Sequence, residues 1–104
     1  MDKELVKLLN DQINMEWYSA YFYLDICSYY TDANLNGFGN WFNVQTQEER
    51  DHAMLFIKYL LNNSEKVILQ DVKAPNVSFT NFREPAVAAF EHVDSIYVAV
   101  DCAG

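Results

Sequence analysis

The sequence predicts an all-α protein, a bundle of long helices in a single domain over residues 1–104. Apolar residues make up 51% of the chain, which is enough to build a hydrophobic core. Only three glycines and two prolines interrupt the chain, which favours a few long elements over many short strands. Along two long stretches the apolar side chains recur in steps of three and four, which is the spacing of a helix face.

The first helix is expected over residues 3–30. Asp2 is a suitable N-cap, because its carboxylate can accept a hydrogen bond from a backbone N–H of the first turn. One face of this helix carries Leu5, Leu9, Gln12, Glu16, Ala20, Tyr23 and Cys27. A second apolar strip lies beside that face, so the helix needs packing partners on more than one side.

Residues 31–39, with the sequence TDANLNGFG, have the composition of a turn. Such a short connection predicts an antiparallel neighbour, and we expect the second helix over residues 40–62. One stripe of this helix, in steps of three and four, consists of Phe42, Gln45, Glu49, His52, Phe56 and Tyr59.

A long connection is expected over residues 64–83. It contains KVILQDV, which resembles a strand, but no second strand is available to pair with it, so we predict an extended crossover loop. The third helix is expected over residues 85–100, because it opens with Pro85, a residue favoured in the first turn. No fourth helix follows, so the predicted up-and-down bundle is incomplete in this chain.

The stripe of the second helix contains a Glu-x-x-His motif, Glu49 and His52, and the first helix has Glu16 at a matching height. An antiparallel hairpin would bring these three side chains together. Two carboxylates facing each other in a core are costly unless a cation lies between them. Carboxylates with one imidazole are the donor set that iron or manganese takes in helical bundles. The pattern therefore predicts a metal site.

A Glu-x-x-His motif also occurs on helices that bind no metal, where both side chains face water. Its register with apolar residues, and the presence of Glu16, favour the metal site. Glu48 and Arg50 flank the stripe and are expected at the surface. Tyr23, one step along the face from Glu16, has the alternative role of a core tyrosine that donates a hydrogen bond to a carboxylate.

The composition argues against two classes of partner. Fifteen acidic residues against seven basic ones give a net charge of −8, and the basic residues are scattered singly. Nucleic acids and anionic membranes need clustered Lys and Arg, so neither is expected. No signal segment opens the chain and no apolar run approaches the ~18 residues of a membrane span. A cytoplasmic location is expected, with Cys27 and Cys102 as reduced thiols.

Three segments carry a family resemblance: LLNDQINMEWYSAYFYL (8–24), NLNGFGNWFNVQTQEERDHAMLFIKYL (34–60) and KAP (73–75). Over residues 3–92 the sequence resembles bacterial non-haem ferritin subunits. The resemblance implies a four-helix bundle with a long crossover, and a homo-oligomeric cage of 24 subunits. Such a cage oxidises Fe(II) with O₂ at a di-iron site and stores ferric iron. By position, Glu16, Glu49 and His52 match the ligands of the first iron, Glu49 would bridge, and Tyr23 matches a tyrosine beside the site.

The third helix departs from the family pattern. Ferritins place there a Glu, within Tyr-x-His-Glu, that binds the second iron. In AFEHVDSIY (89–97) that position falls at Val93, or at Tyr97 if four residues are inserted before the helix; Glu91 or Asp94 could approach only if the helix turned. Ferritin subunits also continue beyond this point and supply further ligands. We therefore expect an impaired ferroxidase.

Two alternatives to a cage subunit remain open. Two copies of the 3–62 hairpin contain two single Glu and two Glu-x-x-His motifs, the complete di-metal set of a four-helix bundle, so a symmetric dimer could share one site between chains. Burial of ~800 Å² per partner would be enough for such a dimer. The second alternative is a degenerate ferritin-like module that only mediates association. Iron is the expected metal, and manganese and zinc accept the same donors.

Overall fold

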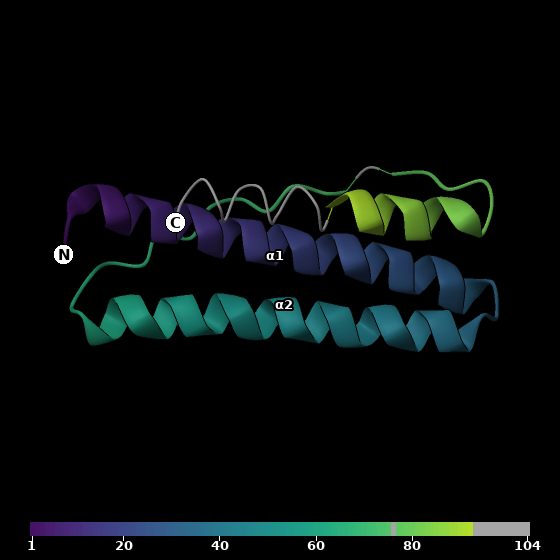
Figure 1. The fold of residues 1–104 in the computed structure, drawn as a ribbon, viewed down its shortest axis with the longest axis horizontal. Coiled ribbons are helices and arrows are strands. Elements are labelled where there is room, and N and C mark those ends of the chain that lie inside the picture. The colour runs from purple at the N-terminus through teal and green to yellow at the C-terminus, as the bar shows by residue number, and fades with distance from the viewer. Residues whose placement is uncertain (76, 93–104) are drawn as a thin grey trace.

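Two long antiparallel helices dominate the structure, a computed structural model that describes residues 1–75 and 77–92 (Figure 1). Helix α1 spans Lys3–Asp32 and helix α2 spans Asn36–Asn62. Residues 83–92 form a third helical segment that lies along α1. Within the described ranges the chain forms no β-strand. The predicted all-α bundle is therefore confirmed.

Helix α1 begins with the side-chain cap that its sequence predicts. The backbone N–H of Glu4 donates to Asp2 Oδ1 at 3.0 Å, which satisfies one of the free donors of the first turn. The helix continues to Asp32, two residues beyond the predicted end. Its 30 residues give it a length of roughly 45 Å at 1.5 Å per residue.

The turn between the two helices is shorter than predicted. Helix α2 begins at Asn36, four residues before the expected start at residue 40. Asn34 takes the left-handed conformation with φ 63°, which an Asn tolerates better than most residues. Gly39 therefore lies inside α2, where a Cβ would collide with the Thr31 hydroxyl. Glycine here serves close helix packing rather than the turn itself.

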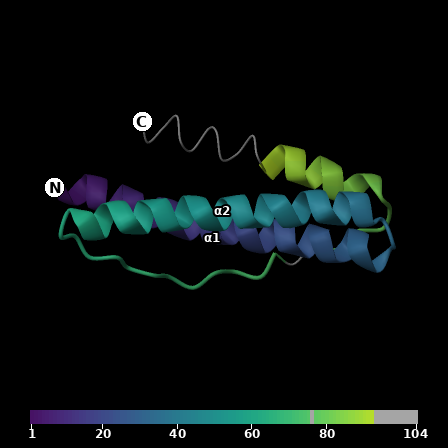
Figure 2. The ribbon, with the colours of Figure 1, turned by 90° about the horizontal axis from the view of Figure 1, so that it is seen from below.

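The connection after α2 returns along the hairpin to the opposite end of the bundle, as Figure 2 shows in green. Asn10, which is 3% exposed, fixes its first part to α1. The Asn10 Nδ2 donates to the carbonyl oxygens of Lys66 at 3.2 Å and Val6 at 3.1 Å, and Oδ1 accepts from Ile68 N at 2.7 Å. A single amide thus satisfies backbone groups that have no strand partner.

The third segment starts at residue 83, before the predicted Pro85. Asn81 Oδ1 accepts hydrogen bonds at 3.0 Å from the backbone N–H groups of Arg83 and Glu84, and so caps the helix earlier. Its predicted continuation to residue 100 lies outside the described residues. The segment completes a buried cluster that consists of Phe22, Tyr23, Ile26, Tyr30, Phe42 and Ala89.

Neither the hairpin nor the rest of the described chain offers a helix that is apolar for long enough to cross a bilayer. Helix α2 buries one narrow face, whereas α1 buries residues on more than one side. Helix α2 turns Phe42, Ala53 and Leu60 toward α1, and these side chains are almost completely buried. This rotation of α2 sets the position of its remaining stripe, which carries the candidate ligands.

Candidate metal centre

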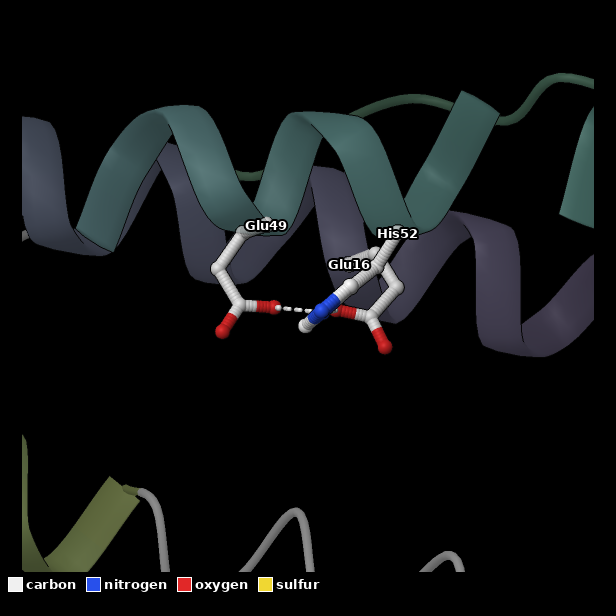
Figure 3. Close-up of side chains that lie close together, drawn as sticks. All are labelled: Glu16, Glu49 and His52. Atoms are coloured by element: carbon white, nitrogen blue, oxygen red, sulfur yellow. Dashed lines mark ion pairs between the residues drawn. The ribbon is translucent and has the colours of Figure 1, made fainter. Parts of the chain in front are cut away.

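Three side chains from the two helices converge near the middle of the hairpin. Glu16 comes from α1, and Glu49 and His52 come from successive turns of α2 (Figure 3). One ligand atom from each residue lies within 4.8 Å of the other two. His52 Nδ1 is 3.7 Å from Glu16 Oε2 and 3.6 Å from Glu49 Oε2, which is too far for hydrogen bonds. The hairpin therefore brings all three predicted ligands to one place.

The burial of the three side chains is unequal. Glu16 is 5% exposed as a residue, and the Glu49 side chain is 13% exposed. The His52 side chain is 53% exposed, so the expectation that the whole stripe faces the core is wrong for this residue. The reason is the rotation of α2, which directs Ala53 at α1 and leaves its neighbour at the edge of the interface. The centre is closed on one side and open on the other.

The two carboxylates strongly influence each other. Burial raises the pKa of Glu49 to about 8, helped by the nearby negative charges of Glu16 and Glu48. Like charges in a poorly solvated place favour the protonated form in this way. Without a cation, Glu49 therefore holds a proton at neutral pH.

Glu16 supplies an acceptor that the protein itself leaves unused. Its Oε1 accepts a hydrogen bond of 2.9 Å from Gln12 Nε2, which fixes the carboxylate. Its Oε2 is buried and has no hydrogen-bond partner in the structure. A buried, unpartnered carboxylate oxygen is costly, and a cation between it and Glu49 would remove that cost. The donor set, two carboxylates and an imidazole, fits Fe(II) and similar divalent ions.

Tyr23 is a core residue in the structure, with 2% of its surface exposed. Its ring contacts those of Phe22 and Phe42, each with centroids 6.1 Å away, and that of His92 at 5.8 Å. These contacts explain why an aromatic residue stands here. A role beside the metal site stays a prediction.

The third-helix positions are only partly described. Val93, Asp94 and Tyr97 lie outside the described residues. Glu91 is exposed and lines a surface hollow with residues such as Arg83, and it is not among the three residues whose ligand atoms converge. The described residues thus supply one group of converging donors.

His92 contacts residues of α1 close to the candidate site, and the sequence pattern did not predict this. Its Nε2 lies 2.8 Å from the hydroxyl of Ser19, which is completely buried one turn after Glu16. Its ring stacks on Phe22 with centroids 4.7 Å apart. Burial lowers the pKa of His92 and the Glu16 charge partly offsets this, so the surroundings favour the neutral form of the ring. The only signal in the sequence was a small hydroxyl residue on the inner face of the first helix.

Comparison with known proteins supports the same fold. The ferritin-like domain family matches residues 6–100. The bacterial non-heme ferritin of Campylobacter jejuni is 37% identical over 101 residues, 97% of this chain and 60% of that protein. The one from Staphylococcus epidermidis is 34% identical over 84 residues, 81% of this chain and 51% of that protein. The chain thus spans little more than half the length of these relatives.

Solved structures agree with the sequence comparison. An open pore ferritin from the archaeon Archaeoglobus fulgidus superposes with a TM-score of 0.94 at 33% identity, covering 99% of this chain and 64% of that one. The Chlorobium tepidum ferritin superposes with a TM-score of 0.93 at 23% identity, covering 99% of this chain and 63% of that one, and supports the fold alone. On the family match, the relatives and the fold together, this chain belongs to the ferritin-like domain family.

Proposed function

We propose that this chain binds Fe(II) at Glu16, Glu49 and His52 and takes part in the oxidation and storage of iron as ferric iron. The observation that carries the proposal is the buried Glu16 Oε2, which has no partner and lies beside a second carboxylate and an imidazole nitrogen. Membership of the ferritin-like domain family supports iron as the ion.

Each residue has a distinct task in this proposal. Glu16 is held by Gln12 and offers its free oxygen without reorganisation. Glu49 releases its proton when the cation enters, and its bridging role follows from the family resemblance alone. His52 supplies the single nitrogen, and its exposed edge gives Fe(II) a path from solvent.

The proposed reaction is the loss of one electron from each Fe(II), with O₂ as the acceptor. Carboxylate oxygens favour Fe(III) over Fe(II), because hard anionic donors stabilise the higher charge. The described residues offer one group of iron ligands. A single iron gives O₂ one electron, and no second iron beside it can supply another. Slow oxidation is therefore expected, and Mn(II) or Zn(II) would compete for the same donors. We place this chemistry in the cytoplasm, where iron is handled under reducing conditions.

Metal loading tests this proposal. The purified 104-residue chain is titrated with Fe(II) without oxygen, the bound metal per chain is counted, and ferric absorbance is followed after air is admitted. We expect saturable binding and slow oxidation, and loss of both in Glu49→Gln. Asp71→Asn, which removes a carboxylate at an exposed residue of the connection, is the control and should behave as the unaltered chain. Absence of specific binding in the unaltered chain would leave only the association-module alternative, and equal binding in all three proteins would mean that iron binds at another place.

A further inference from the structure

The start of α2 contains a dipeptide whose chemistry the metal centre does not use. Asn36 is followed by Gly37, and no other asparagine in the sequence precedes a glycine. An asparagine loses its side-chain amide when the backbone nitrogen of the next residue attacks its side-chain carbonyl carbon. Glycine as the next residue favours this attack, because it has no Cβ to shield the nitrogen or to restrict the backbone.

Both residues are accessible to solvent in the first turn of α2. Asn36 is the first residue of the helix, and both Asn36 and Gly37 are exposed. A Cβ at Gly37 would meet no other described group within 4 Å, so this part of the backbone is not shielded by a neighbouring element. Water and hydroxide can therefore reach the atoms that would react.

The attacking nitrogen is not held by a hydrogen bond. The backbone N–H of Gly39 donates to the Leu35 carbonyl at 2.9 Å, whereas the described residues offer no acceptor to the N–H of Gly37. The N-cap residue, Leu35, makes no side-chain cap either. The attack requires rotation about the Cα–C bond of Asn36, which opens only hydrogen bonds of the first turn. Such fraying of a helix end costs little free energy.

We propose that Asn36 is a site of spontaneous deamidation in the folded chain. A base removes the proton of Gly37 N, this nitrogen forms a bond to Asn36 Cγ, and the side-chain NH₂ group takes up a proton and leaves as ammonia. The product is a succinimide ring. Water then opens the ring at one of its two carbonyl carbons and gives either aspartate or isoaspartate. Water is consumed, ammonia is released, and no electrons are transferred.

The two products should affect α2 in opposite ways. The first turn of α2 has no acidic residue and no side-chain cap. An aspartate at position 36 places a negative charge beside the free N–H groups of this turn, which the helix dipole favours. An isoaspartate instead adds one backbone atom three residues before Gly39, whose packing against Thr31 is close. The first product therefore stabilises the start of the helix, and the second disturbs it.

Peptide mapping by mass spectrometry tests the proposal. The 104-residue chain is kept at mildly alkaline pH for several weeks, and conversion is measured at Asn36 and at two exposed controls, Asn34 and Asn40, which precede Leu35 and Trp41. Conversion at Asn36 should be about tenfold faster or more than at either control, because only Asn36 precedes a glycine. Isoelectric focusing should show that the net charge of −8 becomes one unit more negative.

Gly37→Ala removes the feature that favours the attack and preserves the fold. Gly37 has no positive φ and no neighbour that a Cβ would meet, and alanine is the better helix former, so this variant should fold as the unaltered chain does. Its conversion at Asn36 should be about tenfold slower or more. Asn36→Asp contains the acid product from the start and should melt about 2–4 °C higher than the unaltered chain. A lower melting temperature would overturn the stabilising effect of that product.

Urea separates a reaction of the folded chain from a reaction that needs unfolding. Conversion at Asn36 in the folded chain should lie within about tenfold of its rate in a concentration of urea that unfolds the protein, because the helix end opens easily. A larger difference would show that the helix protects Asn36, and this would overturn the proposal. Equal conversion at Asn34, Asn36 and Asn40 would overturn it as well. None of these outcomes depends on iron binding.

Discussion

Glu16 Oε2 and His52 Nδ1 lie 3.7 Å apart on two different helices and form no hydrogen bond. Two ligand atoms at about 2.1 Å from a common ion are separated by roughly 3.0 Å at a right angle and at most about 4.2 Å. The 3.7 Å separation, and the 3.6 Å between His52 Nδ1 and Glu49 Oε2, fall in this interval. Both distances from His52 Nδ1 thus fit a common ion before any ion enters.

Neutralising Glu16 should stabilise the metal-free protein. In Glu16→Gln the Oε1 can still accept the hydrogen bond from Gln12, and the new amide can donate to the Glu49 carboxylate. We expect the free energy of unfolding above about pH 9, where Glu49 has lost its proton, to rise by about 1 kcal/mol, because a like-charge contact becomes a hydrogen bond. Urea unfolding without metal measures this, and Asp71→Asn, at an exposed residue of the connection, should change it by less than about 0.5 kcal/mol. A clear loss of stability in Glu16→Gln would contradict the electrostatic account.

The same variant should lose the stabilisation that metal provides. A divalent ion bound at 100 times its dissociation constant adds about 2.7 kcal/mol to a folded protein. The unaltered chain should therefore melt at a higher temperature when Mn(II) is added. Glu16→Gln should show little change with Mn(II), since an amide oxygen is a weaker donor than a carboxylate.

Metal affinity should depend on pH through Glu49. Because the cation must displace its proton, the apparent affinity for Mn(II) should increase up to tenfold per pH unit from pH 6 to about 8 and then level off. In the metal-free chain the sign is opposite: a raised carboxyl pKa favours folding at low pH. That contribution is present below the ordinary value of 4.5 and is lost as the pH rises to about 8. Unfolding curves of Glu49→Gln should lack this slope.

Asn10 should be the main attachment of the crossover connection. Asn10→Ala removes three hydrogen bonds and leaves the Ile68 N–H and the Lys66 carbonyl without their partner. We expect a loss of about 2 kcal/mol in the free energy of unfolding. Asn63→Ala, which removes one exposed hydrogen bond to the Tyr59 carbonyl, should cost less than about 1 kcal/mol. Equal losses in both variants would show that the connection is not held in this way.

Substitutions of Ser19 and His92 should have strongly non-additive effects on the free energy of unfolding. Ser19→Ala leaves the half-buried His92 Nε2 without a partner, which should cost about 1–2 kcal/mol. The double variant Ser19→Ala/His92→Phe replaces both polar groups and keeps a ring on Phe22, so it should recover most of this loss. A double-mutant cycle in urea measures the coupling. Additive losses would mean that the third segment is not anchored through this hydrogen bond.

The fold was predictable from the sequence because two long periodic stretches are joined by few residues. The start of α2 was not predictable, because the Asn and Gly residues before residue 40 have the composition of a turn. In the structure Gly39 lies inside the helix, where it allows close contact with Thr31. The grouping of Glu16, Glu49 and His52 followed from their spacing alone. The exposure of His52 could not be predicted in this way. Periodicity shows which residues share a stripe of a helix, but it leaves the rotation of the helix about its own axis uncertain by tens of degrees.

The position of an ion in a crystal tests the central claim most directly. Crystals soaked anaerobically in Fe(II) and measured at the iron absorption edge should show an anomalous peak among Glu16 Oε2, Glu49 Oε2 and His52 Nδ1, at about 2.1 Å from each atom. Glu49→Gln crystals treated in the same way should show none there. A structure with these three side chains apart in solvent, or with iron bound only elsewhere, would contradict the account.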